Sequence, residues 1–365
     1  PKETAESAQK ITLIKTPNDG LQPQTVIDAK GVIHLIYFKG EPSGGDVFYV
    51  KKEPQAEKFS APIRVNSQPG SVIAAGTVRG AHIAIGKNSR VHVSWMGSHM
   101  AEPKGPSNAE PMLYARLNDA RTAFEPQRNL MQFATGLDGG GSVAADAQGN
   151  VYVAWHGQGE TKGEEHRRVY LAKSRDEGKT FTREKPAYDL PTGSCACCGM
   201  RAFAETGGKL YLVYRTATEQ VNRDMYLLSS KDGGETFQGF RLHNWKINAC
   251  PMSTSSFAHG PTGTFVAWET EGQVYYSSVN QSSAPIAAPD NTGKRKHPVI
   301  AVNSQGEMLF VWTEGTGWKK GGSLAWQLYG KDGKPNGEKG EVAGVPVWGL
   351  AAVVARPDGG FTVFY

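Results

Sequence analysis

The sequence predicts an all-β protein built as a β-propeller, on the basis of its composition and of an internal repeat. The 365 residues include 44 glycines and 21 prolines, and 10% of the chain is aromatic. Such a composition is typical of many short strands joined by tight turns. A hairpin-like phrase also recurs at intervals of roughly 50 to 60 residues, which is the period of a propeller blade.

The repeated phrase is an apolar strand of small residues, a turn with Gly, Asn or Asp, and an alternating strand that ends in an aromatic residue. Its copies span 24–38, 80–95, 141–155, 199–214, 253–268, 297–312 and 350–365. Further strands are expected after the first five copies, at 46–51, 112–116, 168–174, 225–230 and 274–278. The last copy has no such downstream half. We expect the segment 11–15 to supply an outer strand there and close the ring, which removes exposed sheet edges.

We therefore predict seven four-stranded blades in one domain spanning 1–365, with a loose polar segment at 1–9. Six blades would result if the terminal hairpin joined an incomplete first blade. A β-sandwich, or two stacked β domains, is the alternative architecture. The composition does not favour it, because no linker-like change divides the chain.

The composition also limits the partners and the location of the protein. No stretch of about 18 apolar residues is present, so we expect no membrane span. The net charge of +5 is modest and the basic residues are scattered, so no nucleic-acid partner is expected. We expect a periplasmic or secreted protein. The chain begins at Pro1 without a methionine or a signal peptide, which we interpret as mature numbering that carries no direct sign of export.

Two segments carry a resemblance to a known family. Ser174–Phe181 and Ser230–Phe237 both fit the pattern S-x-D-x-G-x-T-F, in which Asp and Gly make a tight turn and Phe pins that turn to the blade. The pattern resembles the Asp box, or BNR repeat, of sialidase-like propellers of the neuraminidase superfamily. For a true sialidase the resemblance implies three carboxylate-binding arginines, a Tyr nucleophile with a Glu, and an Asp acid. Arg215 resembles the second arginine, whereas an Arg-Ile-Pro-like phrase for the first is missing.

Soft sulfur donors crowd into two short phrases of the sequence. These donors are Cys195, Cys197, Cys198 and Met200 in the first phrase, and Cys250 and Met252 in the second. The phrases lead directly into the fourth and fifth copies of the repeat. Inner strands of successive blades lie side by side around the channel, so we expect the two phrases to be neighbours at one channel mouth.

The same alternation of strand direction places further polar residues at this mouth. His156 and His297 are candidate metal ligands beside the sulfur donors. The candidate catalytic or ligand-orienting residues are Arg215, Arg79, Asp138 and Glu269. A small molecule or a glycan is therefore the expected ligand, and the face could also receive a protein partner.

Three interpretations of the cysteines remain open at this point. Thiolates and thioethers select copper(I), with zinc as the alternative, although C-x-C-C is not a standard zinc-finger spacing. Structural disulfides would join Cys195 or Cys197 to Cys250. A reactive nucleophilic thiol is the third interpretation.

The leading functional hypothesis is an exported copper protein with its ion at the channel mouth. An open coordination position would indicate a copper-dependent oxidoreductase, and a closed shell would indicate a copper carrier or store. The alternative is a divergent sialidase or other glycoside hydrolase, or a glycan-binding propeller, with the cysteines as disulfides.

Overall fold

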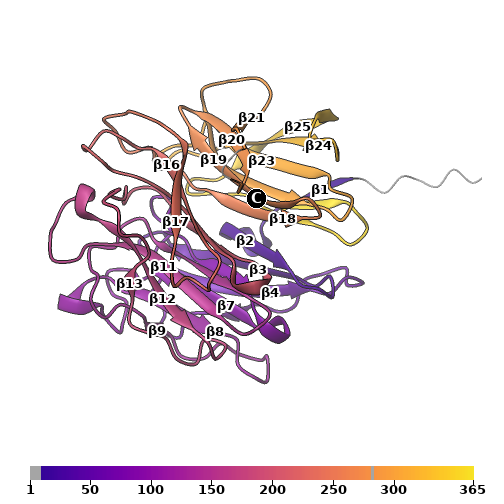
Figure 1. The fold of residues 1–365 in the computed structure, drawn as a ribbon. Coiled ribbons are helices and arrows are strands. Elements are labelled where there is room, and N and C mark those ends of the chain that lie inside the picture. Colours follow the sequence, from indigo (N-terminus) through magenta and orange to yellow (C-terminus); the bar gives the residue numbers. More distant parts are fainter. Residues whose placement is uncertain (1–9, 281–282) are drawn as a thin grey trace, which may run out of the picture.

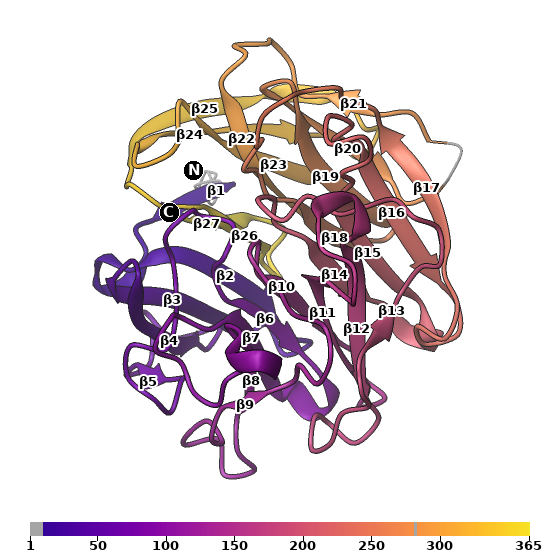
Figure 2. The same ribbon diagram turned by 90° about the vertical axis from the view of Figure 1, so that its left-hand side faces the viewer.

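A computed structural model describes residues 10–280 and 283–365, and in this range the chain forms a ring of seven β-sheets (Figures 1 and 2). The predicted propeller is therefore confirmed, and the alternative of six blades is not. The expected loose segment at 1–9 lies outside the described residues. Within the described part of the chain, no helix is long and apolar enough to cross a membrane.

The strands follow one another through the blades in chain order. The first three blades consist of β2 (Leu21–Ile27), β3 (Ile33–Glu41), β4 (Gly44–Lys52), β5 (Ile63–Arg64); β6 (His82–Ile85), β7 (Val91–Met96), β8 (Met112–Arg116), β9 (Arg128–Asn129); and β10 (Gly141–Ala145), β11 (Val151–Gly157), β12 (Arg168–Ser174), β13 (Lys185–Pro186). The next three consist of β14 (Arg201–Ala204), β15 (Leu210–Arg215), β16 (Met225–Ser230), β17 (Gln238–His243); β18 (Ser256–Gly260), β19 (Gly263–Thr270), β20 (Gln273–Ser278), β21 (Ile286–Ala287); and β22 (Arg295–Val302), β23 (Met308–Glu314), β24 (Gly322–Tyr329), β25 (Pro335–Val345). Short 3-10 turns occur at η1 (Pro17–Asp19), η2 (Lys87–Ser89), η3 (Pro106–Asn108), η4 (Glu164–His166) and η5 (Thr206–Gly208).

The closing blade is built from both ends of the described chain. It contains β26 (Ala352–Ala355), β27 (Phe361–Phe364) and β1 (Ile11–Ile14), and Figure 2 shows β1 beside β27. The predicted closure by an N-terminal strand is confirmed. This blade nevertheless has three strands instead of the four predicted, and β1 pairs with β27 in parallel. Parallel pairing is available here because β1 does not reach β27 through a hairpin, which would impose an antiparallel arrangement.

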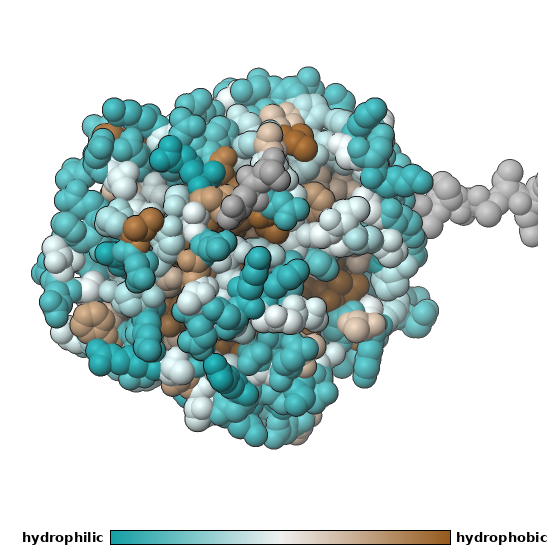
Figure 3. Space-filling view, viewed as in Figure 1, coloured by the Kyte–Doolittle hydropathy of each residue, from teal (hydrophilic) through white to brown (hydrophobic). Residues whose placement is uncertain are grey.

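Apolar side chains fill the spaces between neighbouring blades. Near the ends of the second strands of their blades lie four buried tryptophans, Trp95, Trp155, Trp268 and Trp312. Each belongs to an apolar cluster that joins its own blade to the preceding one. Large aromatic side chains contribute much of the buried apolar area in such a core. The outer surface seen in Figure 3 is mainly hydrophilic, with only scattered hydrophobic spots.

The two S-x-D-x-G-x-T-F segments form the turns between the third and fourth strands of their blades. In the first, Ser174 Oγ donates to Asp176 Oδ1 at 2.7 Å and accepts from the backbone N–H of Gly178 at 2.9 Å. The second segment repeats both bonds at the same distances. Gly178 has a φ of +77°, and a Cβ there would lie 1.8 Å from the hydroxyl of Tyr114, so the position requires glycine.

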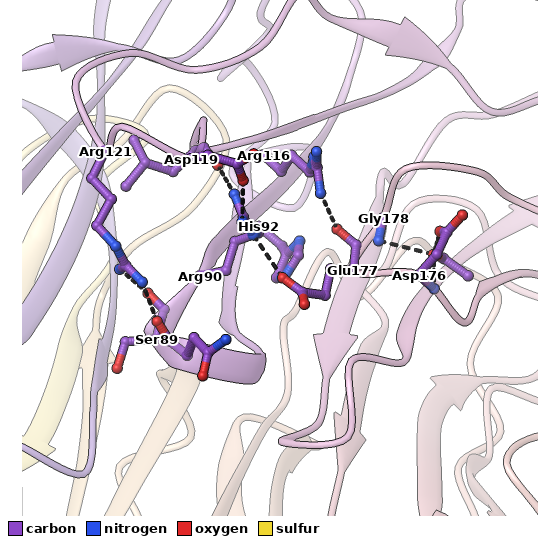
Figure 4. Close-up of polar contacts among 12 residues, drawn as sticks. Ser89, Arg90, His92, Arg116, Asp119, Arg121, Asp176, Glu177 and Gly178 are labelled. Carbon is purple, nitrogen blue, oxygen red and sulfur yellow. Dashed lines mark hydrogen bonds and ion pairs between the residues drawn. The ribbon is translucent and has the colours of Figure 1, made fainter.

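Charged side chains connect the first of these turns to the second blade (Figure 4). Arg90, just before β7, donates to Glu177 Oε2 at 3.0 Å and to Asp119 Oδ1 at 2.5 Å. Arg116 donates to the backbone oxygen of Glu177 at 3.0 Å. The turn of the third blade is thus held against the second blade by two guanidinium groups.

A buried carboxylate makes a second link between these blades, and its removal should destabilise the fold. Glu184 Oε1 accepts hydrogen bonds from the backbone N–H groups of Gln132, Phe133 and Ala134, at 2.9, 2.6 and 2.9 Å. We expect Glu184→Ala to lower the free energy of unfolding by about 3 kcal/mol, because it leaves buried donors without partners. Urea unfolding measures this. The exposed control Glu57→Ala should change stability by less than about 0.5 kcal/mol, and equal stabilities for the two variants would contradict the prediction.

Candidate metal centre

The first cysteine phrase lies on the loop between β13 and β14, which enters the fourth blade. Three backbone hydrogen bonds hold this loop in place. Cys195 N donates to Arg215 O at 2.8 Å, Cys198 N donates to Cys195 O at 3.4 Å, and Gly199 N donates to Ser253 O at 2.9 Å. The loop is therefore anchored to the end of β15 on one side and to the segment before β18 on the other. These anchors turn the three thiols toward one another.

The sulfur atoms of Cys195, Cys197 and Cys198 all lie within 4.8 Å of one another. Cys195 Sγ is 3.2 Å from Cys197 Sγ and 3.7 Å from Cys198 Sγ. A tetrahedral ion that holds thiolates at about 2.3 Å places its sulfurs roughly 3.8 Å apart. Cys195 and Cys198 are buried, and Cys197 is partly exposed. The three thiols can therefore share one ion after small side-chain shifts.

Cys250 lies outside this group of sulfurs. Its side chain is exposed, and all four cysteines are free thiols in the structure. The structure thus brings together three of the four predicted cysteine ligands. It does not form the alternative disulfide between Cys250 and Cys195 or Cys197, because the exposed thiol of Cys250 does not reach the buried cluster.

Two guanidinium groups flank the thiols. Arg215 is 2% exposed and acts electrostatically on Cys198, whereas Arg223 acts on Cys195 and Cys197. Burial, the largest single influence on Cys198, raises its pKa. Four groups outweigh this effect of burial: the S–H groups of Cys195 and Cys197, the guanidinium of Arg215 and a backbone donor at Ser253. The pKa of Cys198 therefore falls well below its ordinary value. Cys198 is therefore the thiol that ionises first.

His156 and His297 lie close enough to interact electrostatically with Cys198, although neither belongs to the compact sulfur group. Burial lowers the pKa of His156 to about 4 and that of His297 to about 3, so both rings are neutral at pH 7. His297 Nδ1 lies 3.2 Å from Thr254 Oγ1. Neither ring nitrogen of the fully buried His156 has a hydrogen-bond partner among the described residues. A neutral imidazole of this kind can donate a lone pair to a metal.

The two methionines have different surroundings. Met200 packs in the apolar cluster between the third and fourth blades, among residues such as Ala202 and Tyr214. Met252 lines a small cavity with His297, Trp318 and other residues. Met200 also lines the central channel cavity with His297, so each predicted thioether ligand lies on a cavity wall that it shares with a predicted histidine ligand.

The four candidate catalytic residues form two pairs. Arg79 donates to Asp138 Oδ1 at 2.6 Å and to Asp138 O at 2.8 Å, at a partly exposed position. Arg215 donates to the backbone oxygens of Glu269 and Arg223, and its guanidinium lies 3.9 Å from the Glu269 carboxylate. Burial raises the pKa of Glu269. The second pair is therefore buried inside the protein, whereas the first is partly exposed.

The loop that contains Glu164 lies against the cysteine phrase and also contacts Arg223, a residue that the sequence did not indicate. The backbone oxygen of Glu164, in η4, accepts from Ser194 N at 3.1 Å. The Glu164 carboxylate accepts from Arg223 Nη2 at 2.7 Å. Arg223 has no motif around it. The only available signal was that its loop leaves β15 at the same channel mouth as Arg215.

Comparisons with known proteins define the class of fold. No protein-family model matches the chain, and no curated protein matches it. A PL25 ulvan lyase bound to -[GlcA(1-4)Rha3S]- has a TM-score of 0.54 and 12% identity, over 92% of this chain and 88% of that chain. A fungal alcohol oxidase of the AA5 family in complex with copper has a TM-score of 0.55 and 10% identity, over 94% and 69%. Trypanosoma rangeli sialidase in complex with DANA has a TM-score of 0.52 and 11% identity, over 81% of this chain and 53% of that chain. These likenesses show a β-propeller fold.

Proposed function

We propose that this protein is an exported copper(I)-binding propeller that holds its ion on Cys195, Cys197 and Cys198. The observation that carries the proposal is the convergence of three free thiols, two of them buried, in a cluster flanked by cations. Soft thiolates select copper(I), and a low pKa at Cys198 supplies one of them before the metal arrives. His156, and Met252 beside His297, are further donors within this region.

The donor set favours copper(I) over zinc. Charge does not separate the two ions, because Arg223 is already paired with the Glu164 carboxylate and Arg215 lies 3.9 Å from that of Glu269. Three clustered thiols instead match the preference of copper(I) for soft thiolate ligands. Zinc would also require a fourth ligand, for which His156 would have to move toward the sulfurs. Zinc is therefore the alternative metal.

The cover over the site supports a carrier or store in preference to an oxidoreductase. Cys195, Cys198 and His156 are at most 1% exposed, and the Glu164 loop lies against the cysteine phrase. An oxidoreductase needs an open coordination position that a substrate can reach. The similar fold of a copper-containing alcohol oxidase supports only the general point that such a propeller can carry copper.

The glycan-directed alternative has less support from the geometry. The guanidinium of Arg215 is buried and hydrogen-bonded to backbone oxygens, so it is not free to hold a carboxylate. Arg79 and Asp138 remain at a partly exposed position, but they are paired with each other. A free arginine cluster of the kind that binds a sugar carboxylate is not formed by these four residues.

Copper loading of the purified, reduced protein tests the proposal. We expect about one copper(I) per chain by elemental analysis, retained against a chromogenic copper(I) chelator. A variant with serine at the three clustered cysteines should lose the ion, and the matched control Cys250→Ser should keep it. Copper retained by the triple variant, or zinc retained in preference to copper, would overturn the proposal.

The proposed export has its own test, which is detection of the unprocessed and mature forms in cell fractions.

A further inference from the structure

The central channel contains a second polar feature, separate from the thiols. Inner strands of five blades, with the segment before β26, line a cavity of about 30 Å³, and these strands surround the centre of the ring in Figure 2. Gln24 of β2, His82 of β6, Arg201 of β14 and Ser256 of β18 contribute polar groups to its wall. No Asp or Glu is among the described residues that line it.

Arg201 makes this cavity unusual. Its guanidinium forms no hydrogen bond or ion pair with any residue of 10–280 and 283–365. Burial lowers the pKa of Arg201 to about 10, so the group stays positively charged at pH 7. Arg201 in turn acts on His82, whose pKa burial already holds well below its usual value. The channel therefore carries an uncompensated positive charge.

Unused donors lie on the same wall. Nδ1 of His82 and Oγ of Ser256 are buried and have no partner among the described residues. Buried polar groups in native proteins are almost always satisfied by protein, water or ions, and buried charges are paired. A guanidinium, a hydroxyl and an imidazole N–H are all donors that suit an anion.

We propose that the channel binds one small inorganic anion, of the size of chloride, between Arg201, His82 and Ser256. The size follows from the cavity, because about 30 Å³ of free space holds one or two particles of water size and not a sugar ring. The anion neutralises Arg201 and accepts the unused hydrogen bonds. This site does not depend on the copper proposal, although Gly199 and His297 line the same cavity and place it beneath the thiol loop.

Bromide, a heavy stand-in for chloride, tests the site directly. Crystals of the full chain grown without chloride and soaked in bromide should give an anomalous peak within hydrogen-bond distance of the Arg201 guanidinium. The peak should vanish in Arg201→Gln and persist in the control Arg175→Gln, whose side chain is 80% exposed. Peaks at exposed arginines only, or a channel peak that survives Arg201→Gln, would overturn the proposal.

A solution measurement distinguishes binding from a general salt effect. At fixed ionic strength, replacing gluconate by 200 mM chloride should raise the Tm of the wild-type protein by a few degrees, because a ligand that binds only the folded state stabilises it. The shift should disappear in Arg201→Gln. Equal shifts in both proteins would contradict the proposal. If Arg201→Gln does not fold, the bromide peak of the wild-type crystal decides alone.

Discussion

Cys198→Ser should reduce the copper(I) affinity of the protein by about 1,000-fold, well beyond the roughly 10–100-fold loss typical of changes outside the ligand shell. Cys198 is 1% exposed and is the thiol with the lowered pKa, so it is the thiolate that meets the metal first. A serine hydroxyl is a hard oxygen donor that does not ionise near pH 7 and does not suit a soft ion. Competition with a copper(I)-specific chelator measures the change.

Two comparisons make this result specific. Cys250→Ser, at the exposed cysteine, should leave the affinity within about twofold of the wild type. Arg223→Met removes one flanking cation and keeps all thiols, and should weaken binding by about tenfold through loss of charge compensation. If Cys198→Ser and Cys250→Ser bound copper equally well, the buried cluster would not be the copper site.

The repeat allowed the fold to be predicted because it depends on local chemistry. Period-two alternation and turn residues define each hairpin, and a terminal aromatic residue such as Trp155 then fills the space between blades. The three-stranded closing blade was not predicted. Its strand β1 pairs in parallel with β27, across the whole length of the chain. No local sequence pattern indicates how many strands a blade closed in this way contains.

The candidate site could be predicted only as far as strand direction determines position. Strand parity placed the cysteine phrase, Arg79 and Asp138 at one mouth of the channel. In the structure the thiols of Cys195, Cys197 and Cys198 converge, and Arg79 pairs with Asp138. The orientation of loop side chains depends on hydrogen bonds between distant segments, so the exposure of Cys250 had no sequence signal. Met200 directly precedes β14, and the alternation of that strand turns its side chain into the apolar space between blades.

Arg215→Met should lower the free energy of unfolding by about 3–5 kcal/mol, because it removes the main cationic partner of the buried Glu269. Arg215 also donates to the backbone oxygens of Arg223 and Glu269, and its guanidinium lies 5.0 Å from the ring centre of Trp245. These acceptors would lose their donor in a region that water does not reach. Urea unfolding measures the loss, and Arg175→Met at an exposed position should have almost no effect.

The double variant Arg215→Met with Glu269→Gln should recover part of this stability, because it removes the unpaired charge along with its partner.

The pH dependence of the Arg215→Met deficit has a defined sign. Burial already raises the pKa of Glu269, and loss of Arg215 removes the stronger of the two cations, Arg215 and Lys296, that oppose this rise. A carboxyl group with a raised folded-state pKa is more stable in the folded protein when protonated, so the deficit of Arg215→Met should shrink as the pH falls. A deficit independent of both pH and Glu269→Gln would show that Arg215 stabilises the fold only through its backbone hydrogen bonds. Loss of ligand binding at unchanged stability would instead favour a substrate-binding arginine.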